Sequence, residues 1–312
     1  MSWFDGFEIA HVEVNGVTLR VRHGGNRGKP PLLLLHGFPQ THVMWHRVAR
    51  QLVDHYFLVL PDLRGYGDSP MPADADDHAQ ASKRAMATDL VALMAALGAP
   101  TFHLCGHDRG GRVAHRLALD HPQRVRKLCV LDIAPTLDMY DGRWAPEVAQ
   151  RAGPQDPYFL FARGYYHWFH LVQPAPLPET MIGGDPRAYL HAKLGGWGAG
   201  GLRHIEPEAL AEYERCFCRP AAIHAACEDY RASAGIDLAH DRASRVQGDA
   251  IRCDMLVLWG ANGLVGKLFD PLTLWQAQCA GRVTGQAVPS GHFIPEELPQ
   301  DTADALWSFF RD

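Results

Sequence analysis

An aspartate between closely spaced glycines is the sharpest chemical signal in the sequence. The segment GHDRGG at 106–111 follows an apolar run, Thr101–Cys105, and precedes a helical pattern that ends near Asp120. This spacing is typical of a nucleophile elbow, a tight strand-to-helix turn whose glycines let the two backbones approach closely. A carboxylate at its centre can displace a leaving group from a saturated carbon and form an ester, which water then cleaves. The elbow therefore predicts that Asp108 is a catalytic nucleophile.

A nucleophile of this kind needs a base and an acid that orients the base. His292 lies late in the chain, between the last strand pattern and the last helical pattern, where its imidazole can take a proton from water. Asp132 follows the strand pattern Val125–Leu131, whereas the loop at 260–264 after the next strand offers no acid. Asp132 is therefore predicted to orient His292, and Asp270 is the alternative acid.

An oxyanion loop is predicted at His36-Gly37-Phe38-Pro39, directly after the buried run Pro31–Leu35. The backbone N–H groups of Phe38 and Arg109 are expected to converge on the oxyanion that forms during ester hydrolysis. A second tight turn, at 62–69, closes the strand before it, and its predicted role is structural.

The elements around these residues alternate between strands and helices. Short apolar or alternating runs predict strands at 9–14, 17–23, 31–35, 57–60, 101–105, 125–131, 255–259 and 283–288. Helical spacing is found at 87–97, 110–120 and 302–310. The first two strands form a hairpin that turns at Asn15-Gly16. The pattern predicts an α/β fold with a mostly parallel, eight-stranded, doubly wound sheet.

The stretch from 135 to 249 interrupts that alternation. It is rich in Trp, Tyr, His and Arg and is predicted to form helices and loops. Because its two ends rejoin the same sheet pattern, an inserted helical cap is favoured over an independent domain. The predicted organisation is a core of residues 1–134 and 250–312 with a cap at 135–249. Within the cap, Gly195–Gly201 predicts a flexible segment.

The composition excludes several classes of protein. The 312 residues carry a formal net charge of −5 without a polybasic run, which argues against nucleic-acid or membrane binding. Seven scattered cysteines predict buried thiols in a reducing compartment, and hence a cytoplasmic protein. There are 18 histidines, but His42 and His46 share a helix face without a third ligand, so no metal is expected.

In combination, these motifs resemble a known family. Asp108 in GHDRGGR, the HGFPQ segment at 36–40 and the acid at Asp132 are similar to the fluoroacetate (haloacetate) dehalogenases of the α/β-hydrolase superfamily, over nearly the whole chain. The resemblance implies an α/β-hydrolase fold and hydrolysis of short 2-halo carboxylic acids through an aspartyl ester. It further implies that the partners are a small halo acid and water, that no cofactor is needed, and that the protein is a homodimer.

The resemblance also assigns the substrate contacts. It implies that Arg109 and Arg112 hold the substrate carboxylate, which suits the two-point geometry of a guanidinium. Two solvated arginines on a helix face are the alternative. It implies that His167, Trp168 and Tyr230 bind the halide through three neutral donors. Without the family, the aromatic stretch around His167 predicts only a buried helix.

Two other functions remain open from the sequence. An epoxide hydrolase uses the same Asp-His chemistry but needs two tyrosine donors from the cap, Tyr230 with Tyr165 or Tyr166, and leaves the arginine pair without a role. A non-catalytic ligand-binding homologue need not keep the catalytic residues, yet all are present. The segment 141–157 makes the chain longer than the family pattern, and if it forms a cap loop over the entrance, the substrate size preference could differ.

Overall fold

A single eight-stranded sheet forms the centre of the computed structural model, which describes residues 3–311. Its spatial order is β1-β2-β4-β3-β5-β6-β7-β8. The strands are β1 (Phe7–Val14), β2 (Val17–Gly24), β3 (Pro31–Leu35), β4 (Phe57–Pro61), β5 (Phe102–His107), β6 (Val125–Leu131), β7 (Asp254–Gly260) and β8 (Val283–Val288). The pairs β1–β2 and β2–β4 are antiparallel, and all other neighbours are parallel. The predicted mostly parallel sheet is confirmed.

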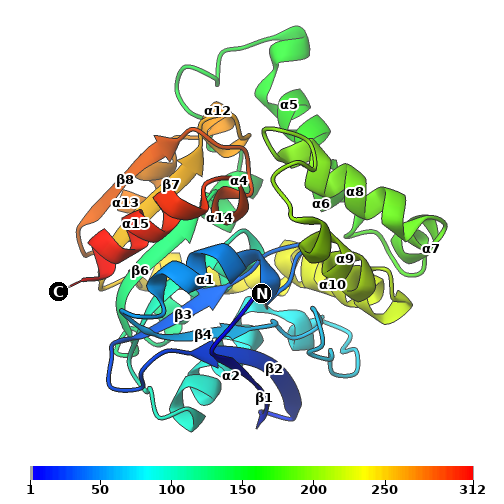
Figure 1. Ribbon diagram of the computed structural model, residues 1–312. Helices are drawn as coiled ribbons and strands as arrows, with labels where there is room; N and C mark the ends of the chain where they lie inside the picture. Colours follow the sequence, from blue (N-terminus) through cyan, green and yellow to red (C-terminus); the bar gives the residue numbers. More distant parts are fainter. Residues whose placement is uncertain (1–2, 312) are drawn as a thin grey trace.

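Helices cover both faces of this sheet. The helices of the core are α1 (His46–Leu52), α2 (Lys83–Ala96), α3 (Arg109–Asp120), α12 (Val265–Leu268), α13 (Pro271–Gln276), α14 (Ile294–Glu297) and α15 (Pro299–Phe310). Helix α1 packs against α15, and α2 packs against α3. Figure 1 shows α1 and α15 on the face turned toward the viewer. The inner strands β3 and β4 are almost wholly buried, as their continuous apolar sequences predict.

The chain between β6 and β7 is helical. It contains α4 (Thr136–Tyr140), α5 (Pro157–Gly164), α6 (Tyr166–His170), α7 (Leu177–Gly183), α8 (Pro186–Trp197), α9 (Pro207–Phe217), α10 (Pro220–Ala234) and α11 (Ile236–Gln247). Several of these helices begin with proline, whose fixed φ and missing N–H suit the first helical position. In Figure 1, α5 to α10 gather on one side of the sheet, and the loop before α5 projects at the top of the view.

The glycine-rich segment at 195–201 differs from the prediction of a flexible stretch. Its first three residues belong to α8, and the chain leaves the helix only at Gly198. The reason is packing, because the Trp197 ring lies against Phe38 and His167 and holds the end of the helix in place.

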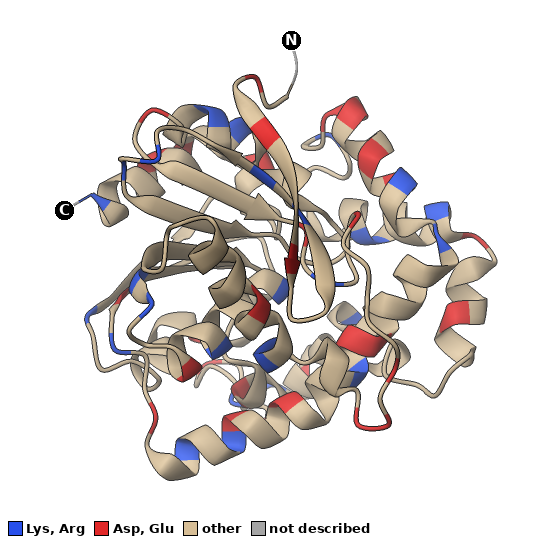
Figure 2. Cartoon of the chain, turned by 90° about the horizontal axis from the view of Figure 1, so that it is seen from below, with Lys and Arg blue, Asp and Glu red and all other residues tan. Residues whose placement is uncertain are grey.

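Charged side chains of both signs are interspersed over the helices and loops (Figure 2), which agrees with the weak net charge. No helix within residues 3–311 is long and apolar enough to cross a membrane. All seven cysteines are free thiols, and four of them are buried.

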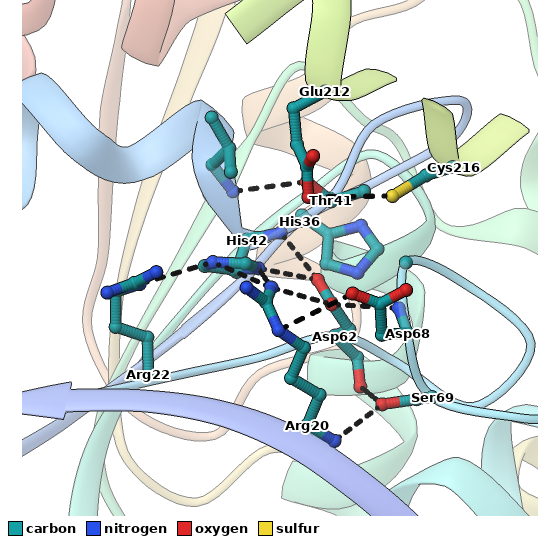
Figure 3. Close-up of polar contacts among 12 residues, drawn as sticks. Arg20, Arg22, His36, Thr41, His42, Asp62, Asp68, Ser69, Glu212 and Cys216 are labelled. Atoms are coloured by element: carbon teal, nitrogen blue, oxygen red, sulfur yellow. Dashed lines mark hydrogen bonds and ion pairs between the residues drawn. The ribbon is translucent and has the colours of Figure 1, made fainter. Parts of the chain in front are cut away.

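A buried carboxylate fixes the loop that follows β3 (Figure 3). Asp62, which follows β4, accepts the backbone N–H of His42 at 3.0 Å, and the His42 ring nitrogen lies 2.7 Å from the same oxygen. Burial alone would raise the pKa of Asp62, but His42 and its hydrogen bonds lower it. His36 accepts the backbone N–H of Leu63 at 3.0 Å. The turn at 62–69 therefore anchors residues 36–42, in agreement with its predicted structural role.

The close approach of β5 and α3 requires glycine. A Cβ atom on Gly106 would lie 2.4 Å from the carbonyl oxygen of Gly110, and one on Gly110 would lie 2.3 Å from that of His36. Both contacts are with backbone, which cannot move aside as a flexible side chain can. The glycines of the elbow are therefore needed for packing.

We predict that Gly106→Ala lowers the free energy of unfolding by about 1–3 kcal/mol, as expected for overpacking against a rigid neighbour. Urea denaturation measures the change. Gly183→Ala is the matched control, because a Cβ there meets nothing within 4 Å inside a helix. Equal stability of the two variants would show that the elbow tolerates a side chain.

Candidate active site

Asp108 occupies the turn between β5 and α3 in a strained backbone conformation. Its φ of 48° lies in the left-handed region that residues other than glycine rarely adopt. The turn directs the carboxylate toward the loop after β3, where the Phe38 N–H donates to Oδ1 at 2.9 Å. Burial would raise the pKa of Asp108, but the nearby charges of His292, His107 and the two arginines lower it. The nucleophile is therefore held in its ionised form.

His292 and Asp132 form a hydrogen-bonded pair beside Asp108. The His292 Nδ1 donates to Asp132 Oδ2 at 2.6 Å, and Asp132 Oδ1 accepts the Gly260 N–H at 2.9 Å. The other ring nitrogen, Nε2, is buried without a hydrogen-bond partner, 3.9 Å from Asp108 Oδ2. Burial lowers the pKa of His292, but the hydrogen bond and charge of Asp132, together with the charges of Asp108 and Glu297, outweigh burial and raise it. The predicted Asp-His-Asp arrangement is assembled in one place.

The alternative acid has a different task. Asp270 caps α13, accepting the Thr273 N–H at 3.1 Å and its hydroxyl at 2.7 Å. The structure therefore favours Asp132 as the partner of His292. His107, inside the elbow, donates from Nε2 to the His292 carbonyl at 2.8 Å and supports the loop that carries the base.

Arg109 is buried in an ion pair that the sequence did not reveal. Its Nε and Nη2 donate to the two carboxylate oxygens of Asp229 at 2.8 and 2.7 Å, and Nη2 also donates to the Asp229 carbonyl at 2.9 Å. Only the Nη1 edge is left, with a long 3.4 Å contact to the Ser233 hydroxyl. Two of the three guanidinium nitrogens of Arg109, Nε and Nη2, are therefore bound to Asp229, and only Nη1 remains for a substrate.

Asp229 also binds two further side chains, those of Tyr66 and Lys83. It is fully buried, accepts the Tyr66 hydroxyl at 2.6 Å, and forms a short ion pair with Lys83. Asp229 precedes Tyr230 in the sequence, so an acid beside a predicted halide ligand was the one available signal. Nothing in the local pattern around Lys83 or Tyr66 indicates that they meet it.

Arg112 is a buried cation without a carboxylate partner. It is 4% exposed, which excludes the alternative of a solvated helix-face residue. Its Nη1 donates to the Thr136 hydroxyl at 2.9 Å and to the Ala134 carbonyl at 3.3 Å, while Nε is buried without a partner. Burial, with the charge of Arg109, lowers the pKa of Arg112. The charge of Asp108 acts in the opposite direction, but no carboxylate among residues 3–311 lies within ion-pair distance of Arg112.

The three predicted halide ligands lie over this region. His167 and Tyr230 have ring centroids 5.4 Å apart, and both contact the Phe38 ring of the oxyanion loop. The Arg112 guanidinium lies 4.8 Å from the Trp168 ring centroid, and the Arg109 guanidinium lies 4.2 Å from that of Tyr230. All three cap residues are buried. Burial lowers the pKa of His167 well below its ordinary value, so its ring is neutral at neutral pH.

A cavity of about 400 Å³ leads to the reacting groups. Its wall includes Asp108, Asp132 and His292 from the core and, from the cap, Leu160, Arg163, Gly164, Tyr165, Tyr166, His167, Lys193 and Trp197. None of the described residues 141–157 is among the side chains that line this cavity. Trp144 of that segment packs on Phe269 and Phe161, so the segment supports α5.

A group with metal-ligand atoms lies elsewhere. Within the described part of the chain, Asp74, His224 and Glu228 place one ligand atom each within 4.8 Å of one another. Their atoms are engaged by neighbours, since Glu228 pairs with Arg231 and His224 pairs with Glu179. The arrangement is explained as a network of ion pairs.

Comparison with known proteins places the chain in a family. Residues 30–299 match the family model described as alpha/beta hydrolase fold. The chain is 45% identical to a fluoroacetate dehalogenase from Burkholderia sp, over 99% of this chain and 95% of that protein. It is 31% identical to a soluble epoxide hydrolase from Corynebacterium sp. (strain C12), over 97% and 98% of the two chains. Among solved structures, ALR0039 from Nostoc sp PCC 7120 matches with a TM-score of 0.89 and 48% identity over 98% of both chains.

The chain therefore belongs to the α/β-hydrolase family of enzymes. Within that family it belongs with the fluoroacetate dehalogenases, as the likeness to the Burkholderia protein shows. The family resemblance seen in the sequence motifs is confirmed.

We predict that Asp132→Asn lowers the pKa of His292, because burial then acts without the carboxylate that opposes it. NMR titration of the imidazole ring protons measures the change. Asp270→Asn removes the charge of a carboxylate that caps α13, where asparagine can still accept the Thr273 N–H, and should leave the titration unchanged. An unaltered His292 titration in Asp132→Asn would contradict the proposed pairing.

Proposed function

We propose that this enzyme is a hydrolytic dehalogenase of short 2-halo carboxylic acids, with fluoroacetate as the leading candidate substrate. Haloacetate and water would give glycolate and halide through an ester on Asp108. The observation that carries the proposal is Arg112, a buried guanidinium beside the nucleophile that lacks a carboxylate partner. A substrate carboxylate supplies the missing charge, and the free Nη1 edge of Arg109 adds a second contact.

The first step is displacement at the carbon that bears the halogen. Asp108 Oδ1 is held by the Phe38 N–H, so Oδ2 is the oxygen free to attack and Oδ1 becomes the carbonyl oxygen of the ester. The new C–O bond forms as the carbon–halogen bond breaks, and the halide leaves with the bonding pair. His167, Trp168 and Tyr230 are proposed to donate to the leaving halide, which matters most for fluoride because its charge is concentrated.

The second step is hydrolysis of the ester at its carbonyl carbon. His292 Nε2, which has no protein partner, takes a proton from water, and Asp132 stabilises the imidazolium that results. The oxyanion develops on Oδ1, where the Phe38 N–H already donates. The Arg109 N–H, at the first position of α3, has no acceptor within its helix and is the proposed second donor. Collapse of the intermediate breaks the bond to the glycolate oxygen, which takes the proton held by His292, and the carboxyl of Asp108 then loses its proton to solvent, so that each turnover releases one proton beside glycolate and halide.

The proposal also covers the cofactor requirement, the cell compartment and the oligomeric state of the enzyme. Water is the only co-reactant that the two steps require, so no cofactor or metal is proposed. The free thiols fit a reducing compartment, and we place the enzyme in the cytoplasm. The family resemblance suggests a homodimer.

Halide release from fluoroacetate and chloroacetate, measured with ion-selective electrodes, tests the function. We expect glycolate and halide in equal amounts from both acids, or from chloroacetate alone if the halide pocket does not suit fluoride. Styrene oxide, assayed for diol formation, is the comparison substrate for an epoxide hydrolase. Diol formation without any halide release would overturn the proposal, and no turnover of any of the three would support a binding protein.

We predict that His292→Asn traps the ester on Asp108, because displacement needs no base whereas hydrolysis does. Intact-protein mass spectrometry after incubation with chloroacetate should show an adduct of one carboxymethyl group. Peptide mapping should place it on Asp108, and Asp108→Asn in the same background should remain unmodified. An unmodified His292→Asn protein that still releases chloride would contradict an ester intermediate.

A further inference from the structure

The outer part of the active-site cavity is lined by cations. Arg163, Lys193 and Lys267 contribute to its wall, whereas its two carboxylates, Asp108 and Asp132, belong to the catalytic group at the inner end. Arg163 and Lys267 are exposed at the rim, and Lys267 donates to a backbone carbonyl. Lys193 differs from both because it is only 2% exposed.

Lys193 is a buried ammonium with no carboxylate within ion-pair distance among the described residues. Its Nζ lies 3.3 Å from the ring centroid of Tyr166, 5.1 Å from that of Trp197 and 5.3 Å from that of Tyr189. Aromatic faces attract a cation but accept its hydrogen bonds poorly, so the three N–H donors lack a strong acceptor. Burial lowers the pKa of Lys193 to about 7, as expected for a cation without an opposite charge.

Lys193 lies close to the predicted halide ligand His167 and to the catalytic base His292. The Trp197 ring that faces Lys193 lies 4.6 Å from the His167 ring and 5.5 Å from the His292 ring, measured between centroids. Lys193 is therefore separated from the halide pocket and the catalytic base by a single aromatic ring. Lys193 and Asp108 line the same cavity, whereas Arg109 and Arg112 are not among its lining residues, so a ligand at Nζ would share the cavity with the nucleophile but not the arginine contacts.

We propose that Lys193, with the rings of Tyr166 and Trp197, forms a second binding site for a small monovalent anion in this passage. The substrate carboxylate on its way in and the halide on its way out share this chemistry. An anion at Nζ receives the hydrogen bonds that the rings cannot accept and neutralises the buried charge. The identity of the natural anions rests on the proposed dehalogenation, whereas the presence of the site does not.

Bromide-soaked crystals test the site directly, because anomalous scattering locates the ion. We expect a peak in contact with Lys193 Nζ in the wild-type protein and in Lys267→Met, the matched rim control. The peak should vanish in Lys193→Met and persist in Lys193→Arg, which keeps the charge. Displacement of that peak by acetate would identify a carboxylate site, and its persistence would identify a halide site. Absence of a wild-type peak at Lys193 would overturn the proposal.

Kinetics provide the second measurement. We expect kcat/KM for chloroacetate to fall about tenfold in Lys193→Met, because anion capture is weakened, with kcat within about twofold and recovery in Lys193→Arg. The drop in kcat/KM with added salt should also be smaller in Lys193→Met than in Lys267→Met. An unchanged kcat/KM in Lys193→Met would overturn a role in the passage. If no variant, nor the wild type, releases halide, the dehalogenase proposal fails while the bromide peak still decides the anion site.

Discussion

The buried carboxylate of Asp229 is the interaction on which the assembled site depends. It stands on the cap helix α10 but binds three groups from the core segments, Arg109, Lys83 and Tyr66. Removing one partner of a buried ion pair typically costs about 3–5 kcal/mol, and loss of Asp229 leaves Arg109 unpaired and Lys83 with Asp237 alone. Because Tyr230 is the next residue in the helix, the same contact sets the position of that phenol over the nucleophile. One carboxylate thus fixes the relation between the core half and the cap half of the site.

The ion pair between Asp229 and Arg109 gives Arg109 and Arg112 different electrostatic environments. The guanidinium of Arg109 is neutralised by Asp229, and its pKa is raised well above the ordinary value despite burial. Arg112 has only neutral acceptors, and burial together with the charge of Arg109 lowers its pKa. Under the proposed function, the substrate carboxylate would therefore be attracted more strongly by Arg112 than by Arg109. The Arg109 guanidinium also lies 4.2 Å from the Tyr230 ring centroid.

The sequence predicted the sheet and the catalytic group because both depend on local patterns. Strands such as Pro31–Leu35 carry continuous apolar runs, and Asp108 lies in a turn whose glycine spacing indicates close backbone contact. Asp229 could not be recognised in this way, since its partners lie at distant positions brought together only by packing. The packing of 141–157 could not be predicted for the same reason. Trp144 rests on Phe269, a contact that no spacing within the insertion indicates.

The charge beside the nucleophile separates the two chemistries that share Asp108 and His292. An epoxide is neutral, and its oxygen needs a proton donor as the ring opens. A halo acid is an anion whose leaving group needs hydrogen bonds but no proton. With a neutral epoxide bound, Arg112 stays buried without a carboxylate at ion-pair distance, and the charge of Asp108 opposes only part of the unfavourable effect of burial. With a substrate carboxylate bound, Arg112 gains an anionic partner at ion-pair distance. The unfavourable free energy of the buried Arg112 charge is therefore relieved by an anionic substrate and not by a neutral one, which favours the proposed halo acid.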